Sequence, residues 1–480
     1  MSWLRALRAI TARVARWPSA TGTWLGERFE LEDSLMAVLR HPVPRELERP
    51  IGWWYVFGSA TLAIFVLQVV TGVGLAMTYV PAPNSAYDSL QFISHDATLG
   101  SVVRGMHFFG AAAMVVLVLI HMTQVYLFGA FKFPREANWL TGSLLLLATL
   151  AMAFTGQLLR WDQDAFWSIV VAAEQAARAP VIGNWLASLV VAGANVGGAT
   201  LTRFYATHVF LIPAAVFGLI GLHLYLVIKR GISEPPVPGV VIDRPTYRGR
   251  YEAMLRRGIP FWPDAAWRDA VIAALAVLAV AILAAIFGAP ELGKPPDPTN
   301  VIADPRPDWY FLGYFAILAL IPPATESIVI VGLPLFAFIF LFLVPLLWPD
   351  GERHWSRRPA AIAAVALPLI AYASLTVAGI ESPWVPKLEG GGLPVAVTQG
   401  LPDAPLRGAN LFGSKSCFAC HAIAGAGGRR APDLTHIGSR LNRDQLTSRI
   451  ATGGGGMPAY AGSLTPSELE DLVAFLLVRR

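Results

Sequence analysis

RGMHFFGAAAMVVLVLIHMTQ, residues 104–124, is an apolar stretch of membrane length with a histidine near each end, His107 and His121. A second stretch, RFYATHVFLIPAAVFGLIGLHLYLV at residues 203–227, carries His208 and His223. A helix turns about 100° per residue, so gaps of fourteen and fifteen residues return to nearly the same face. At about 1.5 Å per residue, the two histidines of each stretch lie roughly 21 Å apart along the helix axis. We therefore predict two bis-histidine sites, one near each face of a bilayer whose apolar core is about 30 Å thick.

Haem iron fits such sites, because histidine nitrogen is a usual axial ligand and a flat apolar ring can lie between helices. We pair His107 with His208 and His121 with His223, so that the four imidazoles would bind two haems b. A lone intramembrane histidine more often bonds to a carbonyl or another histidine, or serves a proton path. Four histidines matched in spacing on two helices favour haem over that alternative.

The composition is typical of a polytopic membrane protein, with 55% hydrophobic and 14% charged residues. The chain of 480 residues is too long for one bundle without an appended domain. The formal charge of +5 lies mostly in loops, so it indicates topology, and we expect no nucleic-acid partner.

Seven stretches are long and apolar enough to span a membrane: about 53–80, 106–128, 139–159, 203–228, 267–288, 326–348 and 360–380. Basic residues collect in the N-terminus and in alternate loops, which the positive-inside rule makes cytoplasmic. We therefore predict a multi-pass protein of a bacterial inner membrane, with a cytoplasmic N-terminus and everything after residue 380 outside. Arginines on one face of residues 1–17 predict an interfacial helix on membrane lipid, or alternatively a solvated helix end.

Spans one and three repeat the histidine period with glycines: Gly58, Gly72, Gly142 and Gly156. A missing side chain would let these helices approach a flat ligand closely, although glycine also serves helix packing in membranes. Arg104 precedes His107, and Arg203 precedes His208. Both arginines would bind haem propionates at the outer face. The alternative is that both arginines extend toward lipid headgroups.

These residues resemble cytochrome b of the cytochrome bc and bf (Rieske–cytochrome b) complexes over about residues 45–380. The resemblance rests on several motifs: FGS (57–59), LQVVTGVGLAMTY (67–79), RGMH (104–107), LLRWDQDAFW (158–167), RFYATH (203–208) and PDWYF (307–311). It implies two non-covalent haems b and a quinone site at each face. It also implies a homodimeric complex containing a Rieske iron–sulfur protein and other bc-complex subunits.

Three features resemble the bf branch: the fifteen-residue histidine spacing, the KRGISEPP sequence at 229–236, and a membrane part that ends after span seven. That branch binds an extra haem covalently through a cysteine near the cytoplasmic face. No cysteine precedes Cys417, so this thioether cannot form here. A non-covalent haem at that place stays open.

PDWYF begins a short apolar stretch, residues 308–323, which we expect to lie along the outer face between spans five and six. The family has glutamate or aspartate at the position of Asp308, and aspartate hints at menaquinol. A carboxylate in a partly dry pocket beside Tyr310 can accept a proton from a quinol hydroxyl. Residues 161–167 would form the other wall of the pocket. A helix cap is the alternative role for Asp308, and both roles can hold together.

Near the C-terminus, Cys417, Cys420 and His421 form C-x-x-C-H, which predicts a covalently bound haem c with His421 on the iron. A redox dithiol or half a zinc site would lack partner residues. Met457 is the predicted sixth ligand, since thioether plus imidazole raises the potential, and His436 is its rival. This region resembles class I cytochromes c, whose haem is attached outside the cytoplasm.

The predicted fold is all-α: a seven-span membrane bundle with two haems b in a four-helix core, plus a C-terminal extramembrane cytochrome c domain. The expected divisions are an interfacial segment (1–50), a four-helix haem-binding domain (51–265), a three-helix subunit IV-like domain (266–380), a linker (381–404) and a cytochrome c domain (405–480).

The expected function is that of a cytochrome b/c subunit of a quinol:cytochrome c oxidoreductase. Quinol would be oxidised near Asp308, and one electron would pass through a Rieske protein to haem c and on to a downstream cytochrome c or oxidase. The other would cross through the two b haems to a quinone near Lys229 and Arg230, generating a proton gradient. A passive dihaem anchor for a dehydrogenase is the rival, and PDWYF argues against it.

Overall fold

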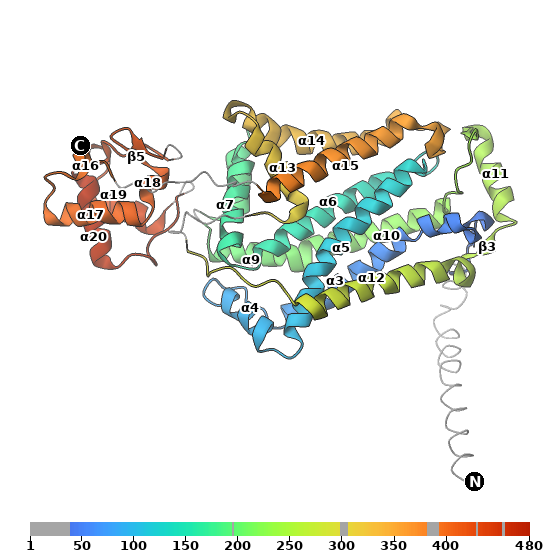
Figure 1. Ribbon diagram of the computed structural model, residues 1–480, viewed down its shortest axis with the longest axis horizontal. Helices are drawn as coiled ribbons and strands as arrows, with labels where there is room; N and C mark the ends of the chain where they lie inside the picture. The colour runs from blue at the N-terminus through green and yellow to red at the C-terminus, as the bar shows by residue number, and fades with distance from the viewer. Residues whose placement is uncertain (1–38, 194–195, 298–305, 382–392, 429–430, 454–456) are drawn as a thin grey trace, which may run out of the picture.

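Long apolar helices dominate the computed structural model, which describes residues 39–193, 196–297, 306–381, 393–428, 431–453 and 457–480 (Figure 1). Within these residues seven helical segments are long and apolar enough to cross a bilayer, which confirms the seven predicted spans. They are η2 (Pro50–Trp54) with α3 (Phe57–Ala76), α5 (Gly100–Leu127), α6 (Glu136–Leu158), α9 (Gly198–Ala206) with η3 (Thr207–Leu211) and α10 (Ile212–Arg230), η4 (Phe261–Ala265) with α12 (Ala266–Phe287), α14 (Pro323–Leu347), and α15 (Pro359–Glu381). The predicted interfacial helix at 1–17 lies outside the described residues.

The spans form helices because hydrocarbon offers backbone groups no hydrogen-bond partners, and a helix satisfies them within one segment. α3 packs against α5 and α12, while α6 packs against α10 and α14. Large apolar side chains such as Phe210, Leu222 and Leu367 remain exposed on the outside of the bundle. Such an apolar exterior is suited to contact with lipid tails.

Shorter helices cover one end of the bundle: α4 (Ala86–His95), α7 (Gln163–Ala177) and α8 (Gly183–Val191) (Figure 1). The carboxylate of Asp162 organises this end, because its Oδ1 accepts from the backbone N–H of Ala165 and caps α7, 3.0 Å away. Its Oδ2 accepts from the backbone N–H of Gly293 at 3.0 Å and also pairs with Arg160. The LLRWDQDAFW motif thus ties α6 to the chain that follows α12.

The short helix α13 (Trp309–Leu320) occurs between spans five and six, where the sequence predicts it. It packs against α15, and a Cβ at Gly313 would lie 2.9 Å from the Tyr372 ring, so only glycine allows this approach. The Tyr372 hydroxyl donates to the carbonyl of Tyr310 at 2.6 Å. α15 therefore fixes the position of the PDWYF segment.

At the opposite end, two antiparallel strand pairs close the loops: β1 (Pro42–Val43) with β3 (Ile259–Pro260), and β2 (Val241–Ile242) with β4 (Gly351–Glu352). Beside them lies α11 (Arg244–Leu255) and an inner polar cluster, made of Arg135, Glu234, Tyr247, Tyr251 and Arg353. Arg353 Nη1 lies 2.8 Å from Glu234 Oε1, and the Tyr247 hydroxyl donates to Glu234 Oε2 at 2.9 Å. Arg135 Nη1 donates to Tyr247 Oη at 2.6 Å. The cluster joins three basic loops that are distant in sequence.

Replacing Glu234 by glutamine is expected to destabilise the folded chain by about 3–5 kcal/mol, because Arg353 would stay buried without its counter-charge. Burial alone would raise the pKa of Glu234, but Arg353 and Arg135 together hold it below its usual range. A depressed carboxylate pKa gives stability that is present above the unfolded-state pKa and is lost as pH falls through the folded-state pKa. Thermal unfolding of the detergent-solubilised protein at several pH values measures both effects.

Glu252→Gln is the matched control, because Glu252 pairs with Arg248 on the exposed face of α11 at 2.9 Å. An exposed pair of this kind contributes about 0–1 kcal/mol. Equal losses for Glu234→Gln and Glu252→Gln would contradict the assignment of the stabilising effect to the inner polar cluster.

The C-terminal domain is a separate helical unit that lies beyond the end of the bundle carrying α7 (Figure 1). It contains α16 (Val395–Thr398), α17 (Asp403–Ser414), α18 (Cys417–Cys420), η6 (Ile437–Ser439), α19 (Arg443–Thr452) and α20 (Pro466–Leu477), with β5 (Ala422–Ile423) paired to β6 (Ala426–Gly427). α17 crosses α20 closely, since a Cβ at Gly408 would lie 2.0 Å from the carbonyl oxygen of Asp471. Phe412 and Phe475 fill the core at that crossing.

Candidate haem and quinol sites

The structure brings His107 of α5 and His208 of η3 opposite each other within the bundle, with the two ring planes nearly perpendicular. Their ring centroids are 6.2 Å apart. A first-row metal binds imidazole nitrogen at about 2.0 Å, as zinc does, so two rings sharing one metal have centroids roughly 6 Å apart. His121 and His223 lie deeper along the same helices, close enough to interact electrostatically. The spacing of the His107 and His208 rings fits the predicted bis-histidine arrangement.

The four predicted glycines each lie against one of these histidines. A Cβ at Gly72 would lie 3.2 Å from His107 Cε1, and one at Gly156 would lie 2.7 Å from His208 Cε1. At the other level, a Cβ at Gly58 would lie 3.2 Å from His121 Cε1, and at Gly142 the distance to His223 Cε1 would be 3.6 Å. α3 and α6 therefore approach the imidazole rings closely at the four glycines, and a crowded set of histidines with glycine neighbours at two levels fits a haem at each level.

A π-helical turn, η3, interrupts span four at His208. Pro213 lies five residues further on and has no N–H to bond to the carbonyl one turn earlier, which favours a widened turn there. A π-turn takes up extra chain within the helix. The fifteen-residue spacing of His208 and His223 therefore presents both rings on one face, as the fourteen-residue spacing does in α5. Pro213 is the sequence signal that identifies this turn.

Four polar partners of the histidines were not found from the sequence. Gln68 Nε2 donates to the carbonyl of His107 at 3.1 Å. Three threonine hydroxyls lie within hydrogen-bonding distance of histidine Nδ1 atoms, in the pairs Thr71–His107, Thr141–His223 and Thr155–His208. Each threonine directly precedes one of the glycines, so the repeated Thr-Gly dipeptide is the signal that could have revealed them.

The two predicted propionate arginines both hydrogen-bond to protein atoms. Arg104 Nη1 donates to Ser94 Oγ at 2.7 Å, and Nη2 donates to the carbonyl of Pro290 at 2.8 Å. Arg203 Nη1 donates to the carbonyl of Leu189 at 3.1 Å. A role in binding propionates stays a prediction for both residues.

Asp308 and Tyr310 form a hydrogen-bonded pair at the start of α13. The Tyr310 hydroxyl donates to Asp308 Oδ2 at 2.5 Å. Asp308 occupies the N-cap position of α13, but within the described residues its side chain makes no capping hydrogen bond. The carboxylate accepts from Tyr310 instead of capping the helix. Burial raises the pKa of Asp308, while the hydrogen bond from Tyr310 and the charge of Arg160 lower it part of the way. A carboxylate with a raised pKa is suited to accepting a proton.

The end of α6 connects this pair to the His107–His208 level. Gln157 directly follows Gly156, which lies against His208, and its Nε2 donates to the carbonyl of Arg306 at 3.5 Å. Arg160 acts electrostatically on Asp308 from the same stretch. The PDWYF segment and the LLRWDQDAFW motif therefore lie close together beside one bis-histidine level, and the quinol pocket between them stays a prediction.

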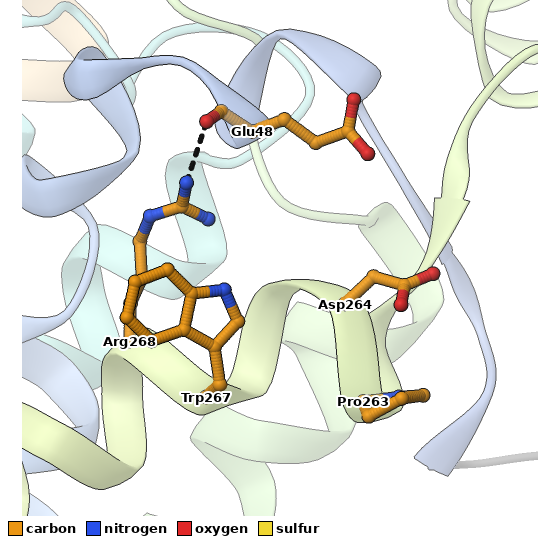
Figure 2. Close-up of a pocket in the computed structure, with 5 residues that line it drawn as sticks. All are labelled: Glu48, Pro263, Asp264, Trp267 and Arg268. Atoms are coloured by element: carbon orange, nitrogen blue, oxygen red, sulfur yellow. Dashed lines mark hydrogen bonds between the residues drawn. The ribbon is translucent and has the colours of Figure 1, made fainter.

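The predicted inner quinone residues lie at the surface of the opposite end. Lys229 Nζ is 5.7 Å from the Tyr225 ring centroid, and the carbonyl of Arg230 accepts from Arg135 Nη2 at 3.3 Å. Figure 2 shows a surface hollow near this end, lined by Glu48, Pro263, Asp264, Trp267 and Arg268. Arg268 Nη2 donates there to the carbonyl of Glu48 at 2.5 Å. The hollow belongs to the packing of η1 (Arg45–Glu48) against the start of α12.

The C-x-x-C-H residues sit on α18 and the residue after it. His421 Nδ1 lies 2.8 Å from the carbonyl of Pro432; because a carbonyl only accepts, Nδ1 carries the proton and Nε2 is free to bind iron. Burial raises the pKa of Cys417 to about 12, so it is a neutral thiol and not the low-pKa thiolate of a redox dithiol. Met457 packs against the core of the domain, and His436 directly precedes η6. These residues fit a covalent haem.

Known families match three parts of the chain. The family model described as Cytochrome b/b6/petB matches residues 42–231, and that described as Cytochrome b(C-terminal)/b6/petD matches residues 295–389. The model described as Cytochrome C oxidase, cbb3-type, subunit III matches residues 403–476.

Individual proteins give the same result. Cytochrome b6 of Heliobacterium modesticaldum is 40% identical over 213 residues, which is 44% of this chain and 99% of that protein. The menaquinol:cytochrome c reductase cytochrome b subunit of Bacillus subtilis is 37% identical over 216 residues, 44% of this chain and 96% of that protein. A solved structure, a hyperthermophilic respiratory Complex III, has a TM-score of 0.61 at 27% identity and covers 75% of this chain and 91% of that chain.

The bundle with its paired histidines is thus that of a haem-binding, multi-pass membrane protein of electron transport. The chain belongs to the cytochrome b/b6 family and carries a cytochrome c domain fused to its C-terminus. The two parts imply haem b and haem c as cofactors.

Proposed function

We propose that this chain is the cytochrome b/c subunit of a bc-type quinol:cytochrome c oxidoreductase in a bacterial inner membrane, with its cytochrome c domain outside. The observation that carries the proposal is the Asp308–Tyr310 pair, placed beside one of two bis-histidine levels. The names of the relatives, a menaquinol:cytochrome c reductase subunit and a respiratory Complex III, support the same activity. A passive electron conduit would not need a half-buried carboxylate at that end of the bundle.

The proposed haem ligands are the four paired histidines of the bundle, with His421 and Met457 in the C-terminal domain. When bound, the haems would supply one-electron transfer between the membrane faces and out to a soluble acceptor. Asp308 would accept a proton from a quinol hydroxyl, and Tyr310 would hold the carboxylate in position. The chain around Trp161 would exclude water from that pocket.

Each quinol releases two protons and two electrons. We propose that the protons leave on the side of Asp308, that one electron passes to a Rieske iron–sulfur partner, and that the other reaches a quinone at the opposite face. The Lys229 and Arg230 surface is the proposed place for that quinone. The cytochrome b6 relatives and the seven spans support membership of the bf-like branch. We further propose that the complex is homodimeric.

The proposal is tested in membranes that hold the whole complex, supplied with a menaquinol analogue and with oxidised cytochrome c. We expect quinol-dependent reduction of the c haem, lost when the Rieske partner is removed genetically. Reduction that persists at full rate without that partner would contradict the proposal.

Replacing Met457 by leucine is expected to keep the c haem covalently attached while lowering its midpoint potential, because thioether ligation raises the potential. Redox titration in the c-haem absorption band measures the change. His436→Ala is the control and is expected to leave that potential unchanged. A lower midpoint potential in His436→Ala, with an unchanged one in Met457→Leu, would assign the sixth ligand to His436 instead.

A further inference from the structure

Three of the four membrane histidines share one hydrogen-bonding pattern. In each case a threonine Oγ1 lies 2.8–3.1 Å from the imidazole Nδ1, in the pairs Thr71–His107, Thr141–His223 and Thr155–His208. The threonines come from α3 and α6, the helices that also supply the glycines. The same helices therefore make room for the imidazole rings and lie within hydrogen-bonding distance of three of them.

The direction of these hydrogen bonds follows from the threonines' own partners. Thr71 donates its hydroxyl proton to the carbonyl of Leu67 at 2.7 Å, and Thr155 donates to the carbonyl of Ala151 at 2.8 Å. Thr141 donates in the same way to a carbonyl one turn earlier, at 3.0–3.1 Å. A hydroxyl has one proton, so the remaining oxygen lone pairs accept from histidine Nδ1–H. The proton is thereby fixed on Nδ1, and Nε2 is left free as a metal ligand.

His121 departs from this pattern. The residue before Gly58 is Phe57, where the other three glycines follow a threonine. Among the residues that the structure describes, the buried Nδ1 of His121 has no hydrogen-bond partner. The His107–His208 level thus has two supported imidazoles, and the His121–His223 level has one.

We propose that Thr71, Thr141 and Thr155 are positioning residues, and that the missing acceptor at position 57 makes the His121–His223 site the easier of the two to reduce. The inference rests on the proposed binding of a haem at each level. An acceptor on the outer ring N–H makes the imidazole more basic. A more basic ligand stabilises the higher charge of oxidised iron, which lowers the midpoint potential. The uneven set of threonines therefore makes electron flow favourable from the level beside Asp308 to the opposite level.

Redox titration of the b haems in the purified complex tests this with two opposite changes. Thr155→Val removes one acceptor at the His107–His208 level. The lower of the two b-haem midpoint potentials should therefore rise, and the difference between the two potentials should narrow. Thr141→Val removes the threonine acceptor at the His121–His223 level, so the higher potential should rise and the difference between the two b-haem potentials should widen. Each loss is expected to change the oxidised-to-reduced ratio up to tenfold, which for one electron is about 59 mV.

Thr155→Ser keeps the hydroxyl and should restore the wild-type potential. Thr149→Val is the matched control, because Thr149 lies on the same helix and bonds to the carbonyl of Leu145 at 2.8 Å. If Thr155→Val does not fold, Thr71→Val tests the same level. Potentials that stay unchanged, or move equally in the Thr149→Val control, would overturn the inference. A wild-type chain without two b haems would instead contradict the proposed function.

Discussion

Quinol oxidation by the Asp308→Asn variant is expected to be slower by a factor of about 10²–10⁴, the usual contribution of a positioned general base. Asparagine has nearly the same shape, and its carbonyl oxygen can still accept the hydrogen bond from Tyr310. It cannot take up a proton, however, so the first step of quinol oxidation loses its acceptor. The haems should remain bound, because Asp308 lies outside both bis-histidine levels.

Steady-state turnover with a quinol analogue, measured beside the reduced-minus-oxidised spectrum, separates catalysis from haem loss. Asp264→Asn is the matched control, since this carboxylate lines the hollow of Figure 2 near the opposite end of the bundle. Normal turnover in Asp308→Asn would remove Asp308 from the mechanism, and equal loss in the control would point to a general effect on the fold.

The Tyr310→Phe variant extends the same prediction to pH. The hydrogen bond from Tyr310 lowers the pKa of Asp308 and so partly offsets the effect of burial. Without it the pKa of Asp308 rises further, and the pH at which turnover is half-maximal should move upward. A profile that stays in place or moves downward would contradict the role given to this hydrogen bond.

Replacing His208 by leucine is expected to remove one of the two b haems, so that the b-type absorbance falls by about half. The potential that remains should be that of the His121–His223 level, and the c-type absorbance should not change. The physical reason is that a six-coordinate iron loses one of its two axial ligands, for which leucine offers no replacement. His223→Leu should remove the other component instead.

Haem extraction and redox titration of each purified variant measure the loss. His95→Ala is the control, because His95 lies on the surface helix α4 and pairs with the exposed Glu291 at 3.6 Å. Retention of both b components in His208→Leu would show that this residue does not hold a haem.

The parts of the fold that follow from periodicity were predictable. The seven spans and the pairing of His107 with His208 come from apolar length and from equal spacing, which are properties of single segments. The glycine contacts follow from the matching period, which marks spans one and three as neighbours of the histidine helices.

The parts that depend on side-chain partners across helices were missed. The threonine contacts depend on where each imidazole Nδ1 atom points, and the spacing of residues along the sequence does not give that orientation. The π-turn at His208 was also missed, although Pro213 marks it. The sequence identified Arg135 and Arg353 only as basic loop residues. Both are buried in the structure, because Glu234 and Tyr247 of another loop bind them there.

The most direct test of the account is the number of haems per chain in the purified wild-type protein. Extraction with acid acetone removes non-covalent haem, and haem that stays with the polypeptide is covalent. The account predicts two extractable b haems and one attached c haem for each chain. A single extractable haem, or none attached, would contradict it.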